Sequence, residues 1–150
     1  MEKITPYSVL IVCEDIKSSA YYLDGKRIAL GIPNSETLAM YAKRNVVVDV
    51  TGLGKAPVTM AKYAIKQCEN SFMQWQSGAL QYFVNEAYCV MDVDDHTSLL
   101  DAIGLIETFN RSTITGSRIT PIISNECFEV WYLLHFMEYS TREIYCKTSH

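Results

Sequence analysis

Long hydrophobic runs are missing from this 150-residue chain. No apolar stretch approaches the ~18 residues that a membrane span requires. The N-terminus, with Glu2 early and Pro6 close behind, lacks the shape of a signal peptide. These absences argue against a membrane protein and against a secreted one, so we expect a cytoplasmic protein.

An excess of positive charge is also missing. The chain has 13 Lys and Arg against 17 Asp and Glu, which gives a formal net charge of −4. A protein with this balance has no global basic field, which counts against a free-standing DNA or RNA binder. It does not exclude a site that meets phosphates through a metal ion.

Paired cysteine motifs are absent as well. The five cysteines are scattered and include no CxxC, and two of them, Cys13 and Cys89, lie inside apolar runs typical of strands. This usage favours buried, reduced thiols over a disulfide framework or a zinc site. The complete set is Cys13, Cys68, Cys89, Cys127 and Cys146.

What the chain does contain is a regular alternation of strand and helix patterns within the length of one domain. Hydrophobic residues make up 49% of the sequence, enough for a globular core. Such alternation predicts an α/β fold with a mainly parallel sheet and helices on both faces. The predicted strands are 7–13, 46–50, 88–91 and 118–124, and the predicted helices are 16–23, 35–43, 57–69, 98–110 and 125–137. Pro121 inside the last strand indicates an edge position.

The third strand runs directly into three acids and a histidine: Asp92, Asp94, Asp95 and His96. If strand geometry persists, Asp92 and Asp94 point to the same side. Two neighbouring carboxylates repel each other unless a cation or a shared proton intervenes. Mg²⁺ or Mn²⁺ suits such oxygen ligands. The alternative is a solvated acidic turn that caps the next helix.

Two further acids favour the metal-site interpretation. Glu14 follows the first strand, and in a parallel sheet its end shares an edge with the end of the third. Three carboxylates distant in sequence are therefore expected to converge there. Glu129 lies in the apolar segment 125–137, where an acid is costly unless it is paired, metal-bound or solvent-facing.

Three blocks carry a resemblance to a known family. One acid after the first strand and Asp-x-Asp after a later one is the pattern of the Toprim domain. Ile11-Val12-Cys13-Glu14 with Lys17-Ser18 resembles the "VCEGxKT" opening of RloB-like proteins. The segments 90–96 and 123–136 are similar to that family's "VFDVDDH" and "ISNPCFELWLLLHF". The blocks keep the family order and span residues 9 to 136.

The resemblance implies a single RloB-like Toprim-type (Rossmann-like) domain over residues 1–150, with 138–150 as a short tail. It implies a metal-dependent nuclease of anti-phage defence that cleaves phosphodiester bonds in DNA or RNA, tRNA included. An OLD-like (ABC-type) ATPase is the implied protein partner, and assembly into a homo-oligomer is left open.

The resemblance also implies residue roles. Glu14, Asp92 and Asp94 match the catalytic positions, and together with Asp95 they would hold Mg²⁺ (or Mn²⁺). The supporting or additional positions are Lys17, His96, Asn125 and Glu129, and Asp15, which the family pattern does not share, is a further candidate at the same site.

The sequence departs from the family pattern close to Glu14. Asp15 replaces a glycine, Ser19 replaces an acid and Ala20 a proline, and further along Glu126 also replaces a proline. The departures around Glu14 motivate an alternative in which the chain is a catalytically degenerate subunit that binds and regulates a partner protein. A receiver-like phosphoesterase is a third reading, ranked last because no lysine follows the fourth strand.

Overall fold

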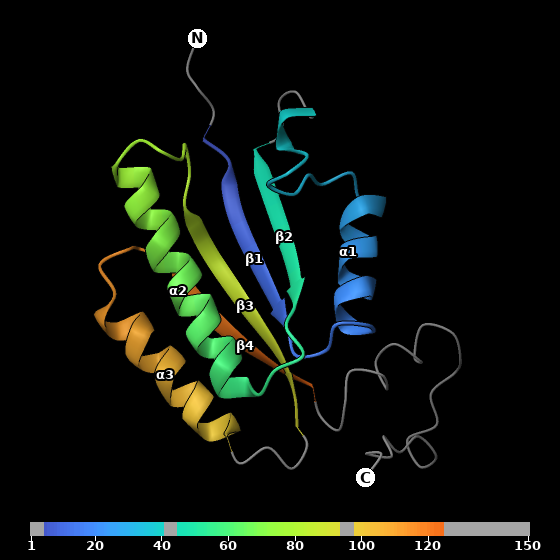
Figure 1. Ribbon diagram of the computed structural model, residues 1–150, viewed down its shortest axis with the longest axis vertical. Coiled ribbons are helices and arrows are strands. Elements are labelled where there is room, and N and C mark those ends of the chain that lie inside the picture. Colours follow the sequence, from blue (N-terminus) through green and yellow to red (C-terminus); the bar gives the residue numbers. More distant parts are fainter. Residues whose placement is uncertain (1–4, 41–44, 94–97, 125–150) are drawn as a thin grey trace.

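In the part of the chain that the structure describes, four parallel strands form a sheet in the order β2-β1-β3-β4 (Figure 1). A computed structural model describes residues 5–40, 45–93 and 98–124. The strands are β1 (Tyr7–Cys13), β2 (Val46–Gly52), β3 (Val84–Asp92) and β4 (Arg118–Ser124). Because all four run in the same direction, their carboxyl ends lie at one edge of the sheet.

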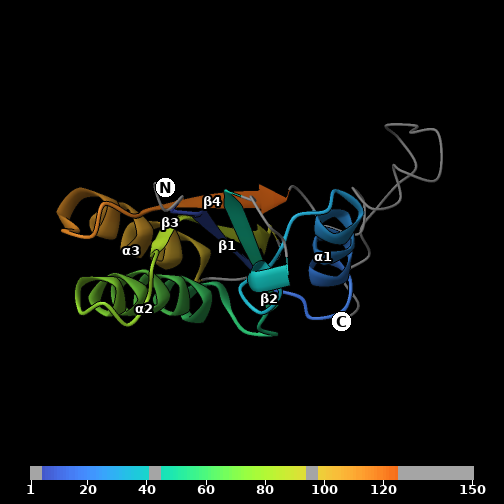
Figure 2. The ribbon, with the colours of Figure 1, turned by 90° about the horizontal axis from the view of Figure 1, so that it is seen from above.

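Three α-helices connect these strands and cover both faces of the sheet. They are α1 (Ser19–Ala29), α2 (Pro57–Gln76) and α3 (Leu99–Ser112), and a 3-10 turn spans Leu38–Met40. Figures 1 and 2 show α2 and α3 packed side by side, with α1 apart from them. The predicted α/β class, with a parallel sheet between helices, is confirmed, and the arrangement is Rossmann-like.

Strand alternation divides the core into two parts. Leu10 and Val12 of β1 face α2 and α3, where they join a large buried cluster with Met60, Met91 and Ile106. The alternate β1 residues face α1, in a smaller cluster centred on Cys13 and Val90. A strand buried on both sides needs apolar residues at every position, which is why β1 reads as a continuous apolar run.

The edge position predicted from Pro121 is correct. Within the described residues β4 pairs only with β3, and Pro121 lies opposite Cys89 in that ladder. A proline has no N–H to donate, so its place on a strand with one free side costs the sheet no hydrogen bond there.

Helix ends were predicted less well than strands. The first helix was expected at 16–23 but runs from Ser19 to Ala29, straight through Gly25. Its last turn is supported by Arg27, whose buried guanidinium donates to Asp24 Oδ1 (2.7 Å) and to the Ile32 carbonyl (2.9 Å). These two bonds help to offset the weak helix preference of glycine.

Two other helix predictions need correction. α2 was expected to end near residue 69 but continues to Gln76, before Gly78 turns the chain with a φ of 82°. The predicted helix 35–43 is, within its described part, only the 3-10 turn Leu38–Met40. The amide and hydroxyl of Ser35 both donate to Asp49 of β2, which ties this segment to the sheet edge. The predicted helix 125–137 lies outside the described residues.

Three of the cysteines are confirmed as buried, free thiols. Burial raises the pKa of Cys13 and Cys68 to about 11 and that of Cys89 to about 12. They are therefore protonated at neutral pH and serve as small apolar side chains. Among the described residues, no helix is long and apolar enough to cross a membrane.

The packing of α3 predicts that substitutions on its buried and exposed sides differ in their effect on the free energy of unfolding. Ile106 is 1% exposed in the larger cluster, whereas Leu100 is 78% exposed on the same helix. Ile106→Ala should lower the free energy of unfolding by roughly 2–5 kcal/mol, since it leaves a cavity. Leu100→Ala should change it by less than about 0.5 kcal/mol. Urea denaturation of both variants measures the difference, and equal midpoints would contradict this description of the core.

Candidate active site at the carboxyl edge of the sheet

Glu14 and Asp92, which are 78 positions apart, meet where β1 and β3 end. The Glu14 amide donates to the Val90 carbonyl (3.1 Å), which extends the strand pairing by one residue. The Glu14 side chain then accepts a hydrogen bond at Oε2 from the Asp92 amide (3.0 Å). The structure thus brings together two of the predicted site residues.

Strand alternation also gives the direction of Asp92. It follows Val90 by two positions, so both side chains lie on the face of the sheet that α1 covers. The pKa of the Cys13 thiol on this face is raised to about 11, chiefly by burial and further by the Asp15 and Asp92 carboxylates, while a hydrogen bond from Ser19 opposes the rise. Negative charge therefore collects beside the end of β1.

Asp15 has a definite structural role. Its Oδ1 accepts from the Lys17 amide (2.6 Å), and its Oδ2 accepts from the Ser18 amide (3.1 Å) and from the Ser18 hydroxyl. A carboxylate that accepts bonds from backbone N–H groups at the start of a helix stabilises that helix end. Asp15 thus caps the turn into α1, and a charge that departs from the family pattern is accommodated next to Glu14.

Gly52 lies against the loop that follows Glu14, a close approach that the sequence analysis did not predict. It ends β2, and a Cβ placed there would lie 2.7 Å from Ile16 Cα and 2.8 Å from the Asp15 carbonyl oxygen. Both neighbours are backbone atoms, which cannot rotate away. Only glycine lets β2 and the loop after Glu14 approach this closely. A glycine inside a strand pattern is the signal that indicates such an approach.

The remaining predicted residues divide into one that is described and five that are not. Lys17 is exposed at the start of α1. Asp94, Asp95, His96, Asn125 and Glu129 lie outside the described residues.

Whether the site suits a metal depends on its oxygen ligands. Within residues 5–40, 45–93 and 98–124, no group of three or more His, Cys, Asp or Glu is placed to hold an ion. Glu14 and Asp92 remain as a pair of carboxylate residues at one edge. Mg²⁺ is commonly bound through only one or two carboxylates and retains several waters, so this donor set fits Mg²⁺.

The capping role of Asp15 leads to a graded stability prediction. Asp15→Ala removes the acceptor for the Lys17 and Ser18 amides and should lower the free energy of unfolding by about 1 kcal/mol. Asp15→Asn keeps one acceptor oxygen and should fall between the alanine variant and the unmodified protein. Urea denaturation checks the order, and an alanine variant as stable as the unmodified protein would refute the cap.

The close approach at Gly52 leads to a second prediction, with a glycine control. Gly52→Ala should cost roughly 1–3 kcal/mol, because backbone atoms must move to admit the new methyl group. Gly25→Ala, in the interior of α1 with no atom within 4 Å of the added Cβ, should instead stabilise the protein by about 0.5–1 kcal/mol. Thermal unfolding of the two variants should therefore shift in opposite directions, and a shared direction would contradict the packing described here.

Comparison with known proteins agrees with the motifs. A family model described as "RloB-like protein" matches residues 9–149, nearly the whole chain. No match was found among curated proteins or among solved structures. The match extends from β1 through the carboxyl edge that holds Glu14 and Asp92 and on beyond β4. The chain belongs to the RloB-like family.

Proposed function

We propose that this protein is a metal-dependent nuclease that cleaves phosphodiester bonds in nucleic acid. The observation that supports this most directly is the hydrogen bond from the Asp92 amide to Glu14 Oε2. It joins, at one edge of a parallel sheet, the two described residues that match the catalytic positions of Toprim-type domains. Ligand sites of open α/β sheets lie at this edge.

The roles of the two acids follow from their positions. Glu14 is fixed by its backbone bond to Val90 and by its side-chain bond to Asp92, so its carboxylate is held in one place for proton transfer or metal contact. Asp92 would supply carboxylate oxygens beside it, and Asp94 and Asp95 are proposed to complete the ligand set. Bound Mg²⁺ or Mn²⁺ would polarise the scissile phosphate and neutralise developing charge.

The biological setting is proposed from family membership. We assign the activity to anti-phage defence, with DNA or RNA (tRNA included) as the substrate and an OLD-like ATPase as the partner. A net charge of −4 fits a nuclease that meets phosphates through a cation, since the chain has no overall basic field to attract them.

A regulatory subunit without catalysis was the alternative raised by the departures around Glu14. The contacts of Asp15 weigh against it. The carboxylate of Asp15 is taken up by the start of α1, and Glu14 still reaches Asp92. The loop therefore tolerates its unusual residue while keeping Glu14 at the strand ends.

The catalytic proposal predicts loss of cleavage without loss of fold. Glu14→Gln and Asp92→Asn should each reduce cleavage by about 10²-fold or more, since a positioned carboxylate is lost while the shape is kept. Glu107→Gln, an exposed acid on α3, is the matched control and should cleave normally. Labelled single-stranded DNA, duplex DNA and tRNA serve as substrates, with and without the co-expressed ATPase.

The same variants test whether the protein binds a metal ion and whether it is instead a regulatory subunit without catalysis. Mn²⁺ binding followed by electron paramagnetic resonance should weaken in both site variants and not in Glu107→Gln. Cleavage by the unmodified protein in excess EDTA would overturn the proposal. A defence phenotype that survives Asp92→Asn would instead favour the regulatory subunit.

A further inference from the structure

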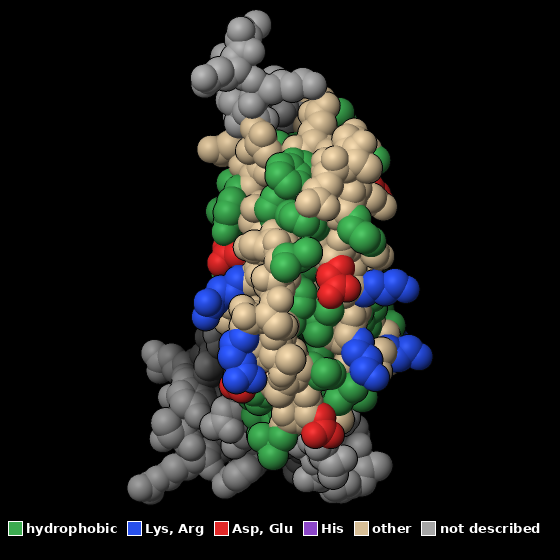
Figure 3. All heavy atoms as spheres, turned by 90° about the vertical axis from the view of Figure 1, so that its left-hand side faces the viewer, with side chains coloured by type: hydrophobic (Ala, Val, Ile, Leu, Met, Phe, Trp, Pro, Cys, Tyr) green, Lys and Arg blue, Asp and Glu red, His purple; other side chains and the backbone are tan. Residues whose placement is uncertain are grey.

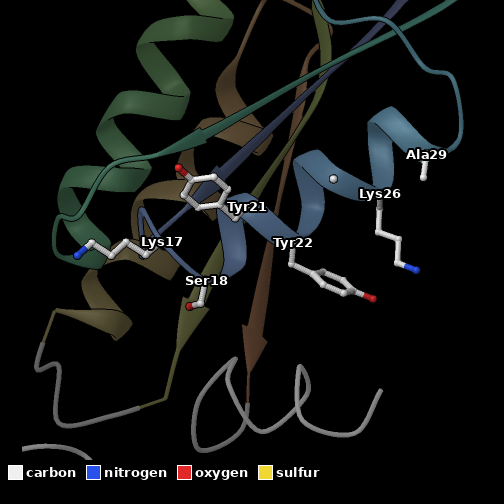
Figure 4. Close-up of a pocket in the computed structure, with 7 residues that line it drawn as sticks. Lys17, Ser18, Tyr21, Tyr22, Lys26 and Ala29 are labelled. Atoms are coloured by element: carbon white, nitrogen blue, oxygen red, sulfur yellow. The ribbon is translucent and has the colours of Figure 1, made fainter. Parts of the chain in front are cut away.

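A groove of about 530 Å³ is lined by residues of α1 and of the turn before it (Figure 4). Its described lining comes from α1 and from the two residues before it. Two lysines, Lys17 and Lys26, and two tyrosines, Tyr21 and Tyr22, supply the long side chains. Gly25 adds no side chain and leaves space between them.

Two lysine–tyrosine pairs have a spacing of four positions in the sequence, and the second pair lies within α1. Lys17 precedes Tyr21 by four positions, and Tyr22 precedes Lys26 by four. Figure 4 shows the Lys17 and Tyr21 side chains extending to one side of the helix and those of Tyr22 and Lys26 to the other. The Lys26 ammonium lies 5.6 Å from the centre of the Tyr22 ring, a cation–π distance.

The two lysines carry positive charge that the described part of the chain leaves without a salt bridge. Within that part, the ion pair on α1 joins Arg27 to Asp24, at 2.7 Å, and it uses the one acid of the helix. Lys17 and Lys26 are both exposed. The groove is therefore locally basic on a protein of net negative charge.

Tyr21 gives the groove an aromatic surface that is exposed in the described part of the fold. Its side chain is 74% exposed, well above the exposure of a tyrosine that packs on a core. Exposed aromatic rings beside basic groups are the usual elements of a surface for single-stranded nucleic acid, because unpaired bases stack on the rings and phosphates approach the cations.

The groove also begins next to the candidate site. Lys17 is three residues after Glu14, and its amide is held by Asp15 Oδ1 at 2.6 Å. From Ser18 to Lys26 the helix advances about 12 Å. A strand lying along α1 would thus have one end at the edge that holds Glu14 and Asp92.

We propose that the α1 groove binds a single-stranded stretch of nucleic acid, with Lys17 and Lys26 at the phosphates and Tyr21 stacked on a base. The inference rests on the proposed nuclease function and adds to it the form of the substrate and the path to the site. An acidic protein segment is the competing occupant, but it would give the Tyr21 ring no base to stack on.

The first experiment measures the binding of single-stranded nucleic acid separately from its cleavage. Fluorescence anisotropy of fluorescein-labelled oligothymidylate in EDTA reports binding while metal-dependent cleavage is blocked. The double variant Lys17→Ala/Lys26→Ala should weaken binding at least about tenfold. It should also lower the slope of log K against log salt by about 1.4, which corresponds to two phosphate contacts on a single strand.

The aromatic contact has its own signature. Tyr21→Ala should weaken binding by about fivefold or more and leave the salt slope unchanged, since stacking involves no counterion release. Tyr21→Phe retains the ring and should bind as the unmodified protein does. Equal loss in both Tyr21 variants would overturn the stacking role.

The matched control is Lys62→Ala/Lys66→Ala. Both lysines are exposed on α2, on the opposite side of the sheet from α1. That side of the molecule carries acidic and basic side chains intermixed (Figure 3). The control removes the same charge and should bind oligothymidylate normally. Equal weakening by the two double variants, or tighter binding of duplex than of single strand, would overturn the inference.

The outcomes separate this inference from the function on which it rests. If metal-dependent cleavage is lost in Glu14→Gln but the groove variants bind and cleave normally, the groove assignment fails and the nuclease stands. If the unmodified protein shows neither cleavage nor binding, both the groove assignment and the nuclease function fail. If the groove variants lose binding, while Glu14→Gln binds normally but does not cleave, both the groove assignment and the nuclease function are supported.

Discussion

The parallel pairing of β1 with β3 is the constraint on which the rest of the structure depends. It places the end of β1 beside the end of β3 and allows Glu14 to bond first to Val90 and then to Asp92. The same pairing sets the alternation that divides the core between α2 and α3 on one face and α1 on the other. The pairing of β1 with β3 therefore determines both the position of the candidate site and the packing of the core.

Acidic side chains gather at the carboxyl edge of the sheet, and nearby hydrogen-bond donors and lysines offset their negative charge. Asp15 is engaged with amides at the start of α1, where the helix dipole favours an anion. Glu14 accepts a backbone N–H. Beyond the edge, Lys17 and Lys26 provide positive charge along α1. The proposed binding of a phosphate chain and a metal ion rests on this arrangement of acids at the strand ends and cations along the neighbouring helix.

Much of this could be predicted from residues, and the failures have physical reasons. β1 and β4 were predicted with their observed bounds, because apolar runs between polar turns mark buried strands. That Glu14 and Asp92 lie at one edge of the sheet follows from parallel topology, whereas the order that places β1 beside β3 was not predicted. The end of α1 was missed because Gly25 reads as a break, while the bonds of Arg27 that sustain the last turn are tertiary. The close approach at Gly52 was missed because it joins segments distant in the chain. The expected contributions of Asp94, Asp95, His96, Asn125 and Glu129 stay predictions.

The order of the strands has a consequence for the growing polypeptide. β1 lies between β2 and β3, and β3 becomes available only when the chain has been made as far as Asp92. Non-local pairing of this kind is slow, because a long loop must close before its contacts form. A ribosome-bound chain that has emerged only as far as β2 has Glu14 but no Asp92 to hold it. The pair of Glu14 and Asp92 is thus absent from the nascent protein at this stage and forms only when β3 joins the sheet.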